Sequence, residues 1–439
     1  MRFRAADLAA AVGGALHGES DVEVDGVAID SRLVHGGELF VPIVAQRDGH
    51  EFVAAAIAAG ASAVLTQERI PDGVTAIAVA DTGVALLDVG RLARKHLGPL
   101  VVGITGSVGK TSTKDLLAAA LSRRWRTAAS ERSFNNELGV PLTLANVADD
   151  AQAVVVEMGA RARAHVALLC DVARPTVGVV TAVVHAHTEM FGHIDEVAEA
   201  KAELVESLPA AGTAVLNADD ARVSAMAERT AARVLRYSVN GEPGADLVAE
   251  ALHVDDQLRG HFVLRSPFGS APVSLEARGE HQVANALAAA GAALACGVAV
   301  DDVAAGLGDA VLSPWRMDLR HSRSGAMVLN DSYNANPASM EAALRSLAAV
   351  PAHRRIAVLG VMAELGDHSQ VEHEAVLALA DDLGIDVVAF ETAAYAAPAA
   401  EGVDGALAAL GPLGEGDAVL VKGSRVAGLE RVAAALLDS

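Results

Sequence analysis

A glycine-rich loop followed by lysine and threonine is the segment whose residue types most directly indicate chemistry. It reads GSVGKTS over residues 106–112, between an apolar run at 99–104 and a helical pattern. Glycines let backbone N–H groups approach an anion, a helix N-terminus favours negative charge, and Lys110 supplies a compact cation. The Thr111 hydroxyl is placed to bind Mg²⁺. The pattern predicts an ATP site, although Ile104 makes the G-x-x-G-K-T spacing shorter than the strict phosphate loop. A glycine turn with an incidental lysine is the alternative.

Two later apolar runs lead to residues that could bind metal. The first, residues 153–157, is expected to be a buried strand ending in the carboxylate of Glu157, and the second, residues 176–184, runs toward His187. The carboxyl ends of strands meet at the ligand-binding edge of a doubly wound sheet. We therefore expect Glu157 and His187 to converge near the phosphate loop and hold Mg²⁺. For Glu157 alone, a solvated residue at a strand end is the alternative.

Lysine usage singles out two further positions. Only five of the 34 Lys and Arg residues are lysines. A chain that uses arginine almost everywhere is expected to keep lysine where a primary amine is needed. Lys201 lies in a helical pattern at 195–208, and Lys422 follows an apolar strand pattern at 418–421. For Lys201, the alternative is a solvent-exposed lysine in an i,i+4 charge pattern.

The composition excludes one class of partner and indicates a compartment. A net charge of −22 would repel nucleic-acid phosphates, so we expect no nucleic-acid partner. Cys170 and Cys296 lie far apart in apolar patterns, which is typical of reduced core residues in a cytoplasmic protein. The first residues do not resemble a signal peptide. The alanine-rich stretch at 282–300 is expected to be a packed helix and not a membrane span.

The strand and helix patterns group into three units. We expect an N-terminal unit at residues 1–80, a central unit at 81–313 and a smaller C-terminal α/β unit at 314–439, with Pro314 and Trp315 marking the last boundary. Loops at strand ends, where α/β folds place ligand contacts, include DSR and RDGH in the N-terminal unit, which could also be capped turns.

Particular elements are expected within these units. In the N-terminal unit, residues 8–16 read as a helix and residues 22–29 as a strand. In the central unit, residues 133–141 read as a polar loop between two helices, and residues 247–272 read as β-hairpins.

Ten motifs in order along the chain resemble the Mur ligases of peptidoglycan synthesis. They are GITGSVGKTSTKD, SFNNELGVPLT, VVEMGA, AKAELVESLP, LNADD, GEHQVANALAA, WRMD, NDSYNANPASM, MAELGD and VKGSR. The resemblance implies a three-domain α/β architecture with a central P-loop ATPase parallel sheet and a Rossmann-like C-terminal domain. NNELG, SYNANP and MAELG are most similar to the branch that adds D-alanyl-D-alanine to UDP-N-acetylmuramoyl-tripeptide. That likeness implies a monomeric, ADP-forming amide ligase that uses ATP and two Mg²⁺ ions and works through an acyl phosphate.

The resemblance also implies a role for each matching residue. The catalytic set would be Lys110, Glu157, His187, Lys201 and Arg316. Mg²⁺ would be held by Thr111, Glu157, His187 and Lys201, the last as a carbamate, which turns an amine into a carboxylate-like ligand. ATP would be bound by Gly106, Ser107, Val108, Gly109, Lys110, Thr111, Ser112, His281, Asn285, Arg316 and Asp331. The UDP end of the substrate would meet Ser31, Arg32, Asp48, Gly49 and His50. The C-terminal face that receives the dipeptide would present Tyr333, Asn334, Asn336, Lys422 and Arg425, and further substrate contacts would come from Asn135 and Asn136.

Several positions differ from the usual pattern of the family. They are Val108, Ala182, Val184, His185, Ala202 and Val361. None removes a metal or phosphate ligand, yet they leave open a Mur-type ligase of specialised metabolism that acts on another acceptor. A nucleotide-binding paralogue without turnover is a further alternative. Whether the third residue of the substrate peptide is diaminopimelate or lysine also stays open.

Overall fold

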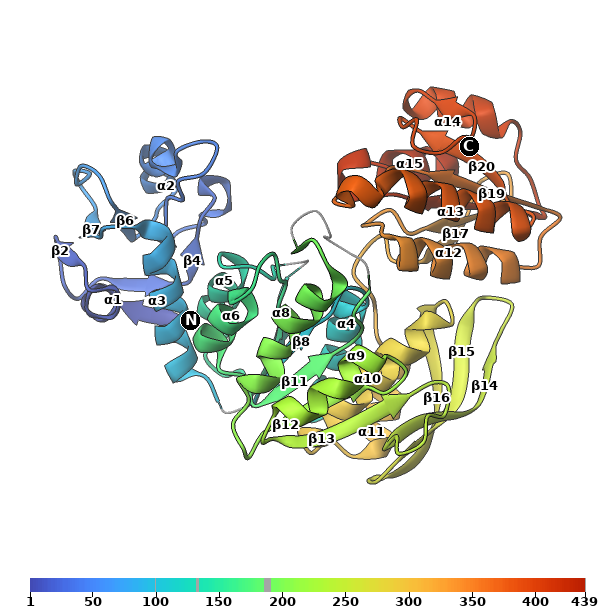
Figure 1. Cartoon of the computed structure of the whole chain (residues 1–439). Helices are drawn as coiled ribbons and strands as arrows, with labels where there is room; N and C mark the ends of the chain where they lie inside the picture. Colours follow the sequence, from blue (N-terminus) through green and yellow to red (C-terminus); the bar gives the residue numbers. More distant parts are fainter. Residues whose placement is uncertain (99, 132–133, 185–190, 439) are drawn as a thin grey trace.

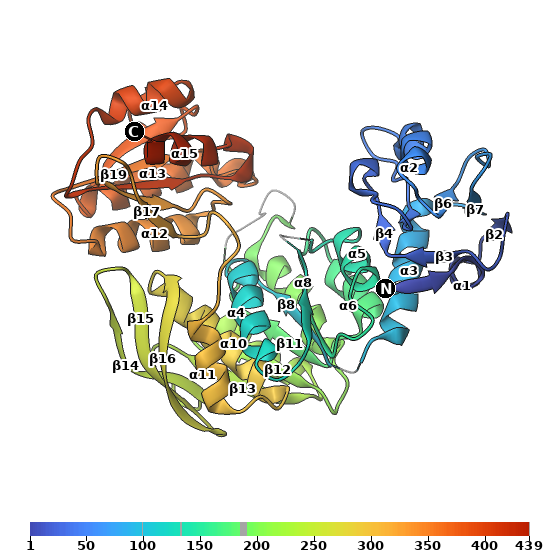
Figure 2. The same ribbon diagram turned by 180° about the vertical axis from the view of Figure 1, so that it is seen from behind.

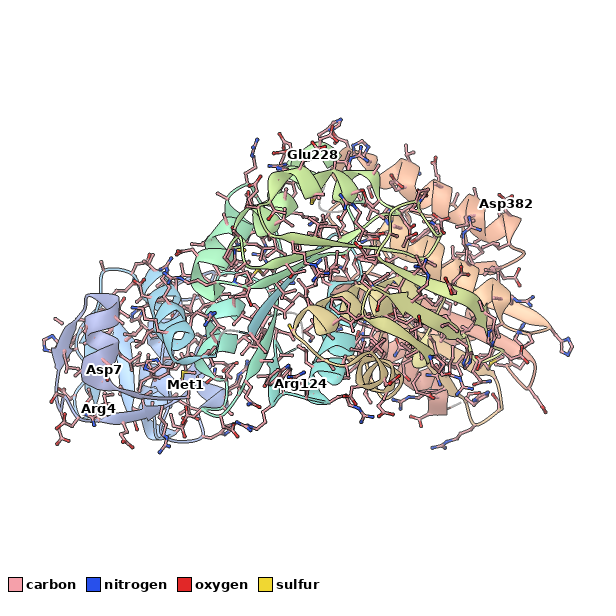
Figure 3. The ribbon with its side chains drawn as sticks, turned by 90° about the horizontal axis from the view of Figure 1, so that it is seen from below. Met1, Arg4, Asp7, Arg124, Glu228 and Asp382 are labelled. Atoms are coloured by element: carbon pink, nitrogen blue, oxygen red, sulfur yellow. The ribbon has the colours of Figure 1, made fainter. Side chains whose placement is uncertain are left out.

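The computed structural model describes residues 1–98, 100–131, 134–184 and 191–438. An N-terminal and a C-terminal part stand at opposite ends of a larger central part (Figures 1 and 2). Viewed from below, the labelled Asp7 and Asp382 lie toward opposite ends of the molecule (Figure 3). The described strands form sheets of two, five, nine and six strands. The expected unit boundaries after residues 80 and 313 stay predictions.

The N-terminal part is built on a five-stranded sheet in the order β2-β7-β6-β5-β4, beside a ribbon of β1 and β3. Helices α1 and α2 complete it, with two short 3-10 turns at Ser31–Leu33 and Gly49–Phe52. The bounds of its elements are β1 (Arg2–Arg4), α1 (Ala5–Val12), β2 (Ala15–His17), β3 (Glu23–Asp25), β4 (Val27–Ala28), β5 (Leu39–Phe40), α2 (Val53–Ala58), β6 (Ala63–Thr66) and β7 (Thr75–Ala78).

Two expected elements of this part are wrong in detail. The strand expected at 22–29 is divided into β3 and β4 by Gly26, whose φ of +85° departs from strand geometry. There Asn146 of the central part accepts a hydrogen bond from Val27 N at 2.8 Å and donates to Val27 O at 2.9 Å. The helix expected at 8–16 ends at Val12, because Gly13 closes it in a left-handed conformation.

The central part is a nine-stranded sheet in the order β16-β15-β14-β13-β12-β11-β8-β10-β9. Strands β8 to β14 pair in parallel, and β15 and β16 extend the sheet antiparallel. Because β8 lies between β11 and β10, the loop that follows β8 is flanked by the carboxyl ends of both neighbours. The bounds are β8 (Leu100–Thr105), β9 (Thr127–Ala129), β10 (Ala153–Glu157), β11 (Val177–Val180), β12 (Thr213–Asn217), β13 (Arg233–Ser238), β14 (Leu247–Val254), β15 (Arg259–Ser266) and β16 (Gly269–Arg278).

Helices cover both faces of this sheet, and neighbouring residues of the strands alternate between two cores. One core takes α4, α10 and α11, and the other takes α3, α5, α6 and α8. Alanines fill the buried face of α10, so the expected packed helix is confirmed. The bounds are α3 (Thr82–His96), α4 (Lys110–Ser122), α5 (Gly139–Ala145), α6 (His165–Ala173), α8 (Ile194–Glu206), α9 (Ala221–Ala225), α10 (His281–Ala295) and α11 (Val300–Gly308).

The polar segment expected between two helices is preceded instead by a strand. β9 stands after α4, and α5 already begins at Gly139, inside the expected loop of 133–141. β9 has only three residues, TAA, and its pairing with β10 supplies its hydrogen bonds. A segment this short carries no periodicity that would predict a strand.

The C-terminal part is a six-stranded sheet in the order β17-β18-β22-β19-β20-β21, with helices on both faces. The bounds are β17 (Asp318–His321), β18 (Met327–Asn330), α12 (Pro337–Ala349), β19 (Arg354–Leu359), α13 (Ser369–Asp382), β20 (Asp386–Phe390), β21 (Ala399–Ala400), α14 (Gly402–Leu410), β22 (Asp417–Lys422) and α15 (Glu430–Asp438). Across the described ranges of the chain, none of the helices is both long and apolar enough to cross a membrane.

The connection between the central and C-terminal parts is held at both ends. Ser313 N donates to the carboxylate of Asp115 on α4 at 2.7 Å, and Trp315 O accepts from Tyr333 N at 3.3 Å. Trp315 and Met317 have φ of +62° and +52°, a left-handed conformation that costs energy for residues with a side chain. Surrounding contacts therefore impose this turn.

The packing of α3 against α5 and α6 within the central part yields a test of stability. A Cβ on Gly90 would lie 2.6 Å from Pro141 Cβ and 2.9 Å from Val172 Cγ1. Gly90→Ala should lower the free energy of unfolding by about 1–3 kcal/mol through overpacking. The higher helix propensity of alanine should offset up to about 1 kcal/mol of this loss. Val84→Ala, at a residue of α3 that is 55% exposed, is the control and should change stability by less than about 0.5 kcal/mol. Urea unfolding measures both, and a Gly90 variant as stable as the control would contradict the tight packing.

Candidate active site

The loop that joins β8 to α4 needs glycine at two positions. Gly106 has φ of +149° and Gly109 has φ of +81°. A Cβ on Gly109 would overlap the amide oxygen of Asn285, and one on Gly106 would overlap the hydroxyl of Thr181. The backbone therefore passes close to α10 and to the segment after β11 with no room for side chains. This is the backbone path that an anion cradle requires.

Residues that depart from the family pattern contact this loop through backbone atoms. Ser107 N donates to Ala182 O at 2.7 Å, and Ser107 Oγ donates to Val184 O at 3.0 Å. Val108 contributes its carbonyl oxygen, which accepts from Thr181 Oγ1 at 2.6 Å. Because main-chain groups make these bonds, apolar side chains at the three positions leave the loop in place.

The side chain of Lys110 folds back and donates hydrogen bonds to main-chain oxygens of its own loop. Its ammonium group donates to Gly106 O at 2.7 Å and to Ser107 O at 3.4 Å. Burial lowers the pKa of Lys110, the charge of Glu157 raises that pKa, and the charge of Arg316 lowers it. The loop carbonyls are neutral acceptors, so a phosphate group would be a stronger partner for this cation.

Glu157 and Thr111, two of the predicted metal ligands, are in contact. Thr111 Oγ1 donates to Glu157 Oε2 at 2.8 Å, and Asn135 Nδ2 donates to Glu157 Oε1 at 2.8 Å. Glu157 is 1% exposed, which contradicts the alternative of a solvated strand end. Hard oxygen atoms of a hydroxyl and a carboxylate suit Mg²⁺. Asn135, expected to contact substrate, here orients the carboxylate.

Lys201 is buried, although charged neighbours in sequence suggested a surface position as an alternative. The residue is 2% exposed on α8, which overturns that alternative. Burial, and secondly the positive charge of Lys110, lower the pKa of Lys201 well below its ordinary value. A neutral amine is the form that can react with CO₂. His187, the other predicted ligand, lies outside the described residues.

The N-terminus of α10 brings His281 and Asn285 to the loop. Asn285 Nδ2 donates to Gln282 Oε1 at 2.8 Å, and Thr113 Oγ1 donates to Asn285 Oδ1 at 3.4 Å. His281 Nδ1 and Arg316 Nε are buried and make no hydrogen bond within the described parts of the chain. Burial lowers the pKa of His281, the charge of Asp331 raises it, and the charge of Lys422 lowers it. Buried polar atoms of native proteins are nearly always paired, so these two indicate a ligand between α10 and the C-terminal part.

Arg316 reaches the phosphate loop from the C-terminal side. Its guanidinium donates to Thr111 Oγ1 at 2.8 Å and lies over the ring of Tyr333, 4.3 Å from the ring centre. The cation–π contact holds the group in place. One arginine thus connects the loop that begins α4 with the segment that follows β18.

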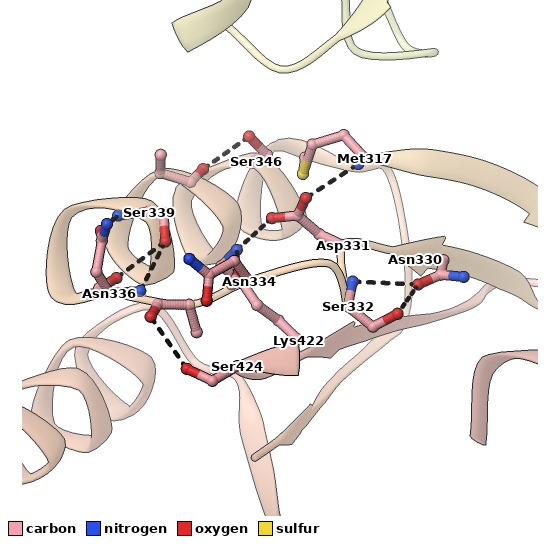
Figure 4. Close-up of polar contacts among 12 residues, drawn as sticks. Met317, Asn330, Asp331, Ser332, Asn334, Asn336, Ser339, Ser346, Lys422 and Ser424 are labelled. Atoms are coloured by element: carbon pink, nitrogen blue, oxygen red, sulfur yellow. Dashed lines mark hydrogen bonds and ion pairs between the residues drawn. The ribbon is translucent and has the colours of Figure 1, made fainter. Parts of the chain in front are cut away.

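Asp331 and Lys422, expected to meet different substrates, form an ion pair (Figure 4). The distance from Lys422 Nζ to Asp331 Oδ2 is 2.5 Å, and the same ammonium donates to Asn334 O at 3.0 Å. Asp331 Oδ1 accepts from Met317 N at 3.2 Å. Asn336 caps α12 by accepting from Ser339 N at 2.9 Å. Part of the polar set expected for substrate therefore also fixes the local fold.

A cavity of about 640 Å³ joins these groups. It is lined by most of the predicted ATP residues and by the C-terminal set, namely Ser107, Val108, Gly109, Lys110, Thr111, Ser112, Glu157, His281, Asn285, Arg316, Asp331, Tyr333, Asn334, Asn336, Lys422 and Arg425, and also Asn135. Gly106, Asn136 and Lys201 are not among the lining residues. The cavity has the size and polar lining of a site for a nucleotide-sized ligand.

The sequence reasoning missed several lining residues. They are Arg161, Thr181, Gln282, Ser339, Glu364 and Ser424 among others. Glu364 belongs to the MAELGD motif. Arg161 is exposed and follows Glu157 by four residues in VVEMGAR. Its position after a strand-end carboxylate could have indicated it.

The predicted UDP-binding residues lie in the N-terminal part and do not line this cavity. Asp30 caps the turn at Ser31 by accepting from Arg32 N at 3.0 Å, and Asp48 caps the next turn by accepting from His50 N at 2.9 Å. Both motifs are therefore capped turns, which was the alternative interpretation of DSR and RDGH. Their role in binding the UDP end stays a prediction.

Asp48, His50 and Glu68 place ligand atoms within 4.8 Å of one another, but His50 is engaged on both sides. Its Nδ1 lies 2.7 Å from Asp48 Oδ1, and its Nε2 accepts from Gln67 N at 3.3 Å. Neither ring nitrogen is left to bind a metal ion.

A buried histidine holds the loop that carries the MAELGD motif. His373 Nε2 accepts from Met362 N at 2.9 Å, and His373 Nδ1 lies 2.6 Å from Ser369 O. Nδ1 therefore carries the proton, because a carbonyl oxygen only accepts. Burial lowers the pKa of His373. Residues 363–365, which follow Met362, line the cavity.

Family models and relatives match most of the chain. The model described as Mur ligase middle domain matches residues 104–293, and that described as Mur ligase, glutamate ligase domain matches residues 315–425. UDP-N-acetylmuramoyl-tripeptide–D-alanyl-D-alanine ligase of Mycobacterium tuberculosis is 39% identical, with 100% of this chain and 98% of the relative covered. The ligase of the same name from Escherichia coli is 35% identical, with 97% and 96% covered.

Solved structures agree with these matches. MurF from Acinetobacter baumannii superposes with a TM-score of 0.90 at 30% identity, covering 100% of this chain and 99% of that one. MurF ligase from Thermotoga maritima, solved in complex with ADP, superposes with a TM-score of 0.83 at 25% identity and covers 94% and 97%.

The environment of His373 predicts a pH dependence of stability. Protonated His373 could not accept a hydrogen bond from Met362 N, so the folded chain binds this proton less readily than the unfolded chain. Histidines of an unfolded chain titrate at about pH 6.5. Neutral His373 therefore contributes to the free energy of unfolding above that pH, and this contribution decreases as the pH falls. His373→Gln can accept and donate but cannot titrate, so it should lose less unfolding free energy than the parent between about pH 7.5 and about pH 5.5. Urea unfolding at both pH values measures this, with exposed His321→Gln as the control. Equal pH slopes for the parent and His373→Gln would contradict the assignment.

Proposed function

The chain belongs to the Mur ligase family, and on that basis we propose that it joins D-alanyl-D-alanine to UDP-N-acetylmuramoyl-tripeptide while ATP is converted to ADP and phosphate. The reaction is a step in the synthesis of the peptidoglycan precursor. The observation that carries the proposal is the single cavity in which the phosphate loop, Glu157 and the C-terminal polar set face one another. Relatives that match over nearly their whole length carry the same ligase name.

In this proposal ATP lies between the central and C-terminal parts. The loop amides and Lys110 bind the β- and γ-phosphates, and Lys110 exchanges its two carbonyl acceptors for phosphate oxygens. His281 and Asn285 face the adenine end, where the free Nδ1 of His281 is available. Arg316 stands over the phosphates, because it already contacts Thr111.

Two residues suited to Mg²⁺, Thr111 and Glu157, are in contact beside the loop. Thr111 and Glu157 would hold one ion, and a carbamylated Lys201 with His187 would hold the second. Bound Mg²⁺ supplies positive charge that offsets repulsion between a carboxylate and a phosphoryl group. Asn135 orients Glu157 by its bond to Oε1, which leaves Oε2 directed at Thr111.

The chemistry has two bond-making steps. A carboxylate oxygen of the tripeptide attacks the γ-phosphorus, and ADP leaves with the bonding pair. The amine of D-alanyl-D-alanine then attacks the acyl carbon of the acyl phosphate, phosphate leaves, and the nitrogen loses a proton. Water would hydrolyse the acyl phosphate, so the C-terminal part is needed to cover the site. Lys110 and Arg316 supply positive charge next to the oxygens on which negative charge develops.

Other features of the proposal follow from the substrates. The N-terminal residues Ser31, Arg32, Asp48, Gly49 and His50 would hold the UDP end, and Tyr333, Asn334, Asn336, Lys422 and Arg425 would receive the dipeptide. The units 1–80, 81–313 and 314–439 then serve as nucleotide-substrate, ATP and acceptor domains. A UDP-linked precursor and ATP are both supplied in the cytoplasm, where the enzyme would act as a monomer.

The two alternatives find less support. The unusual residues Ala182 and Val184 touch the phosphate loop through main-chain atoms, so they give no reason for a different acceptor. An inactive paralogue would have no need for a buried Lys201 beside Lys110.

Phosphate release with defined substrates tests the function. The enzyme with ATP, Mg²⁺, D-alanyl-D-alanine and either the diaminopimelate or the lysine form of UDP-N-acetylmuramoyl-tripeptide should release phosphate and yield the UDP-pentapeptide by mass spectrometry. L-alanyl-L-alanine is the matched control and should give no product. Turnover with another amine but not with D-alanyl-D-alanine would reject the proposed acceptor, and no turnover with any amine would favour the inactive paralogue.

Lys201 provides the sharpest test of the metal site. Its neutral amine can add CO₂ to form a carbamate and release a proton, whereas arginine keeps its charge and cannot react in this way. Lys201→Arg should lower kcat by about 100-fold or more, while ATP binding through Lys110 survives. Lys201→Ala should also be weak but partly restored by acetate, which fits the vacated space. Exposed Lys95→Arg is the control and should keep full activity. Near-normal turnover of Lys201→Arg would disprove the carbamate.

A further inference from the structure

The tip of the β14–β15 hairpin leaves the central sheet and enters the core of the C-terminal part. Leu258, at this tip, is 2% exposed and belongs to the hydrophobic core formed by Met340, Leu344 and Leu347 of α12 and the strands beneath them. Val254 at the end of β14 packs against the same core. In Figures 1 and 2 the free end of this hairpin lies next to α12. A residue of the central part thus completes the packing of another part.

The conformation of the tip is fixed by hydrogen bonds. Leu258 has φ of +62°, which a leucine adopts only where its surroundings impose it. The carboxylate of Asp255 accepts from Gln257 N at 2.9 Å, from Arg259 N at 2.8 Å and from Arg259 Nε at 2.8 Å. The main chain of Leu258 donates to Asp255 O at 2.9 Å and accepts from Gly279 N at 2.8 Å. The leucine side chain is therefore presented by a rigid turn.

The same contact leads directly to the ATP cavity. Gly279 has φ of +99°, and a Cβ there would lie 3.3 Å from Ser346 Oγ on α12. His281, which lines the cavity, begins α10 two residues later. On α12, Ala342 lines the cavity one turn before Ser346. The hairpin tip and Gly279 thus meet α12 on the side where the cavity is built.

We propose that Leu258 is a positioning residue that seats α12 on the central part and so holds the C-terminal half of the ATP site over the phosphate loop. The idea rests on the proposed function, because it assumes that nucleotide binds between the two parts. A hydrophobic side chain suits this task, since it can pack and separate without leaving a buried charge. Removing it should loosen α12 and the Asp331 segment before it, while the phosphate loop keeps its structure.

Truncation of Leu258 tests the proposal. Leu258→Ala should raise the dissociation constant for a non-hydrolysable ATP analogue about tenfold or more, measured by calorimetry. It should also raise KM for ATP more than it lowers kcat. The parent should compact on analogue binding in small-angle scattering, and Leu258→Ala should compact less. Leu258→Met keeps the volume and should restore affinity and compaction.

Controls separate this role from general destabilisation. Phe268→Ala changes a 42% exposed apolar residue at the neighbouring β15–β16 turn and should match the parent in all readouts. All assays are run below the thermal midpoint of each variant. If Leu258→Ala does not fold, Val254→Ala removes a smaller side chain that packs against the same core and gives the comparison without strain at a positive φ. A folded variant with the affinity and compaction of the parent would overturn the proposal. Analogue binding needs no acceptor, so a wrong acceptor assignment leaves this test readable.

Discussion

Repulsion between positive groups gathered around Lys110 of the phosphate loop is the physical constraint on which this site depends. Lys110 senses the charges of Glu157 and Arg316, Lys201 senses the charge of Lys110, and burial lowers the pKa of both lysines. Like charges held together in a medium of low dielectric repel, so the arrangement costs free energy until anions offset it. Phosphate groups and a carbamate would supply that negative charge. An acidic chain of net charge −22 can therefore bind anionic substrates, because Lys110, Arg316 and Lys422 line the cavity where the anion would lie.

The central sheet sets the positions of these groups. β8 lies between β10 and β11 in parallel, so the phosphate loop, Glu157 and the segment after Val180 all emerge at one edge. Small residues let the neighbouring helices approach: Gly109 fits against Asn285 on α10, and alanines line the buried face of that helix. Main-chain bonds carry the loop contacts at Ala182 and Val184, which explains why unusual side chains occur there without disturbing the cradle.

The C-terminal part completes the site, although its residues lie far along the chain from the phosphate loop. Arg316 donates a hydrogen bond to Thr111. The ion pair between Asp331 and Lys422 acts on His281, which lines the same cavity. The parts meet through a turn with two left-handed residues, Trp315 and Met317, and through apolar packing at a hairpin tip. Contacts of this kind are separable, which suits an enzyme that must admit three substrates and then exclude water.

The sequence alone determined the phosphate loop, the strand that ends in Glu157, the order of the units and the family, because these depend on local spacing and on motifs read in order. It also pointed to Lys201 through lysine scarcity, but only the tertiary structure showed that this residue is buried. The division of one expected strand at Gly26 was decided by Asn146, which is distant in sequence. The role of Asn135 on Glu157, the pairing of Asp331 with Lys422 and the burial of Leu258 were likewise decided by folding. Each joins residues whose spacing along the chain carries no periodic signal, so only packing brings them together.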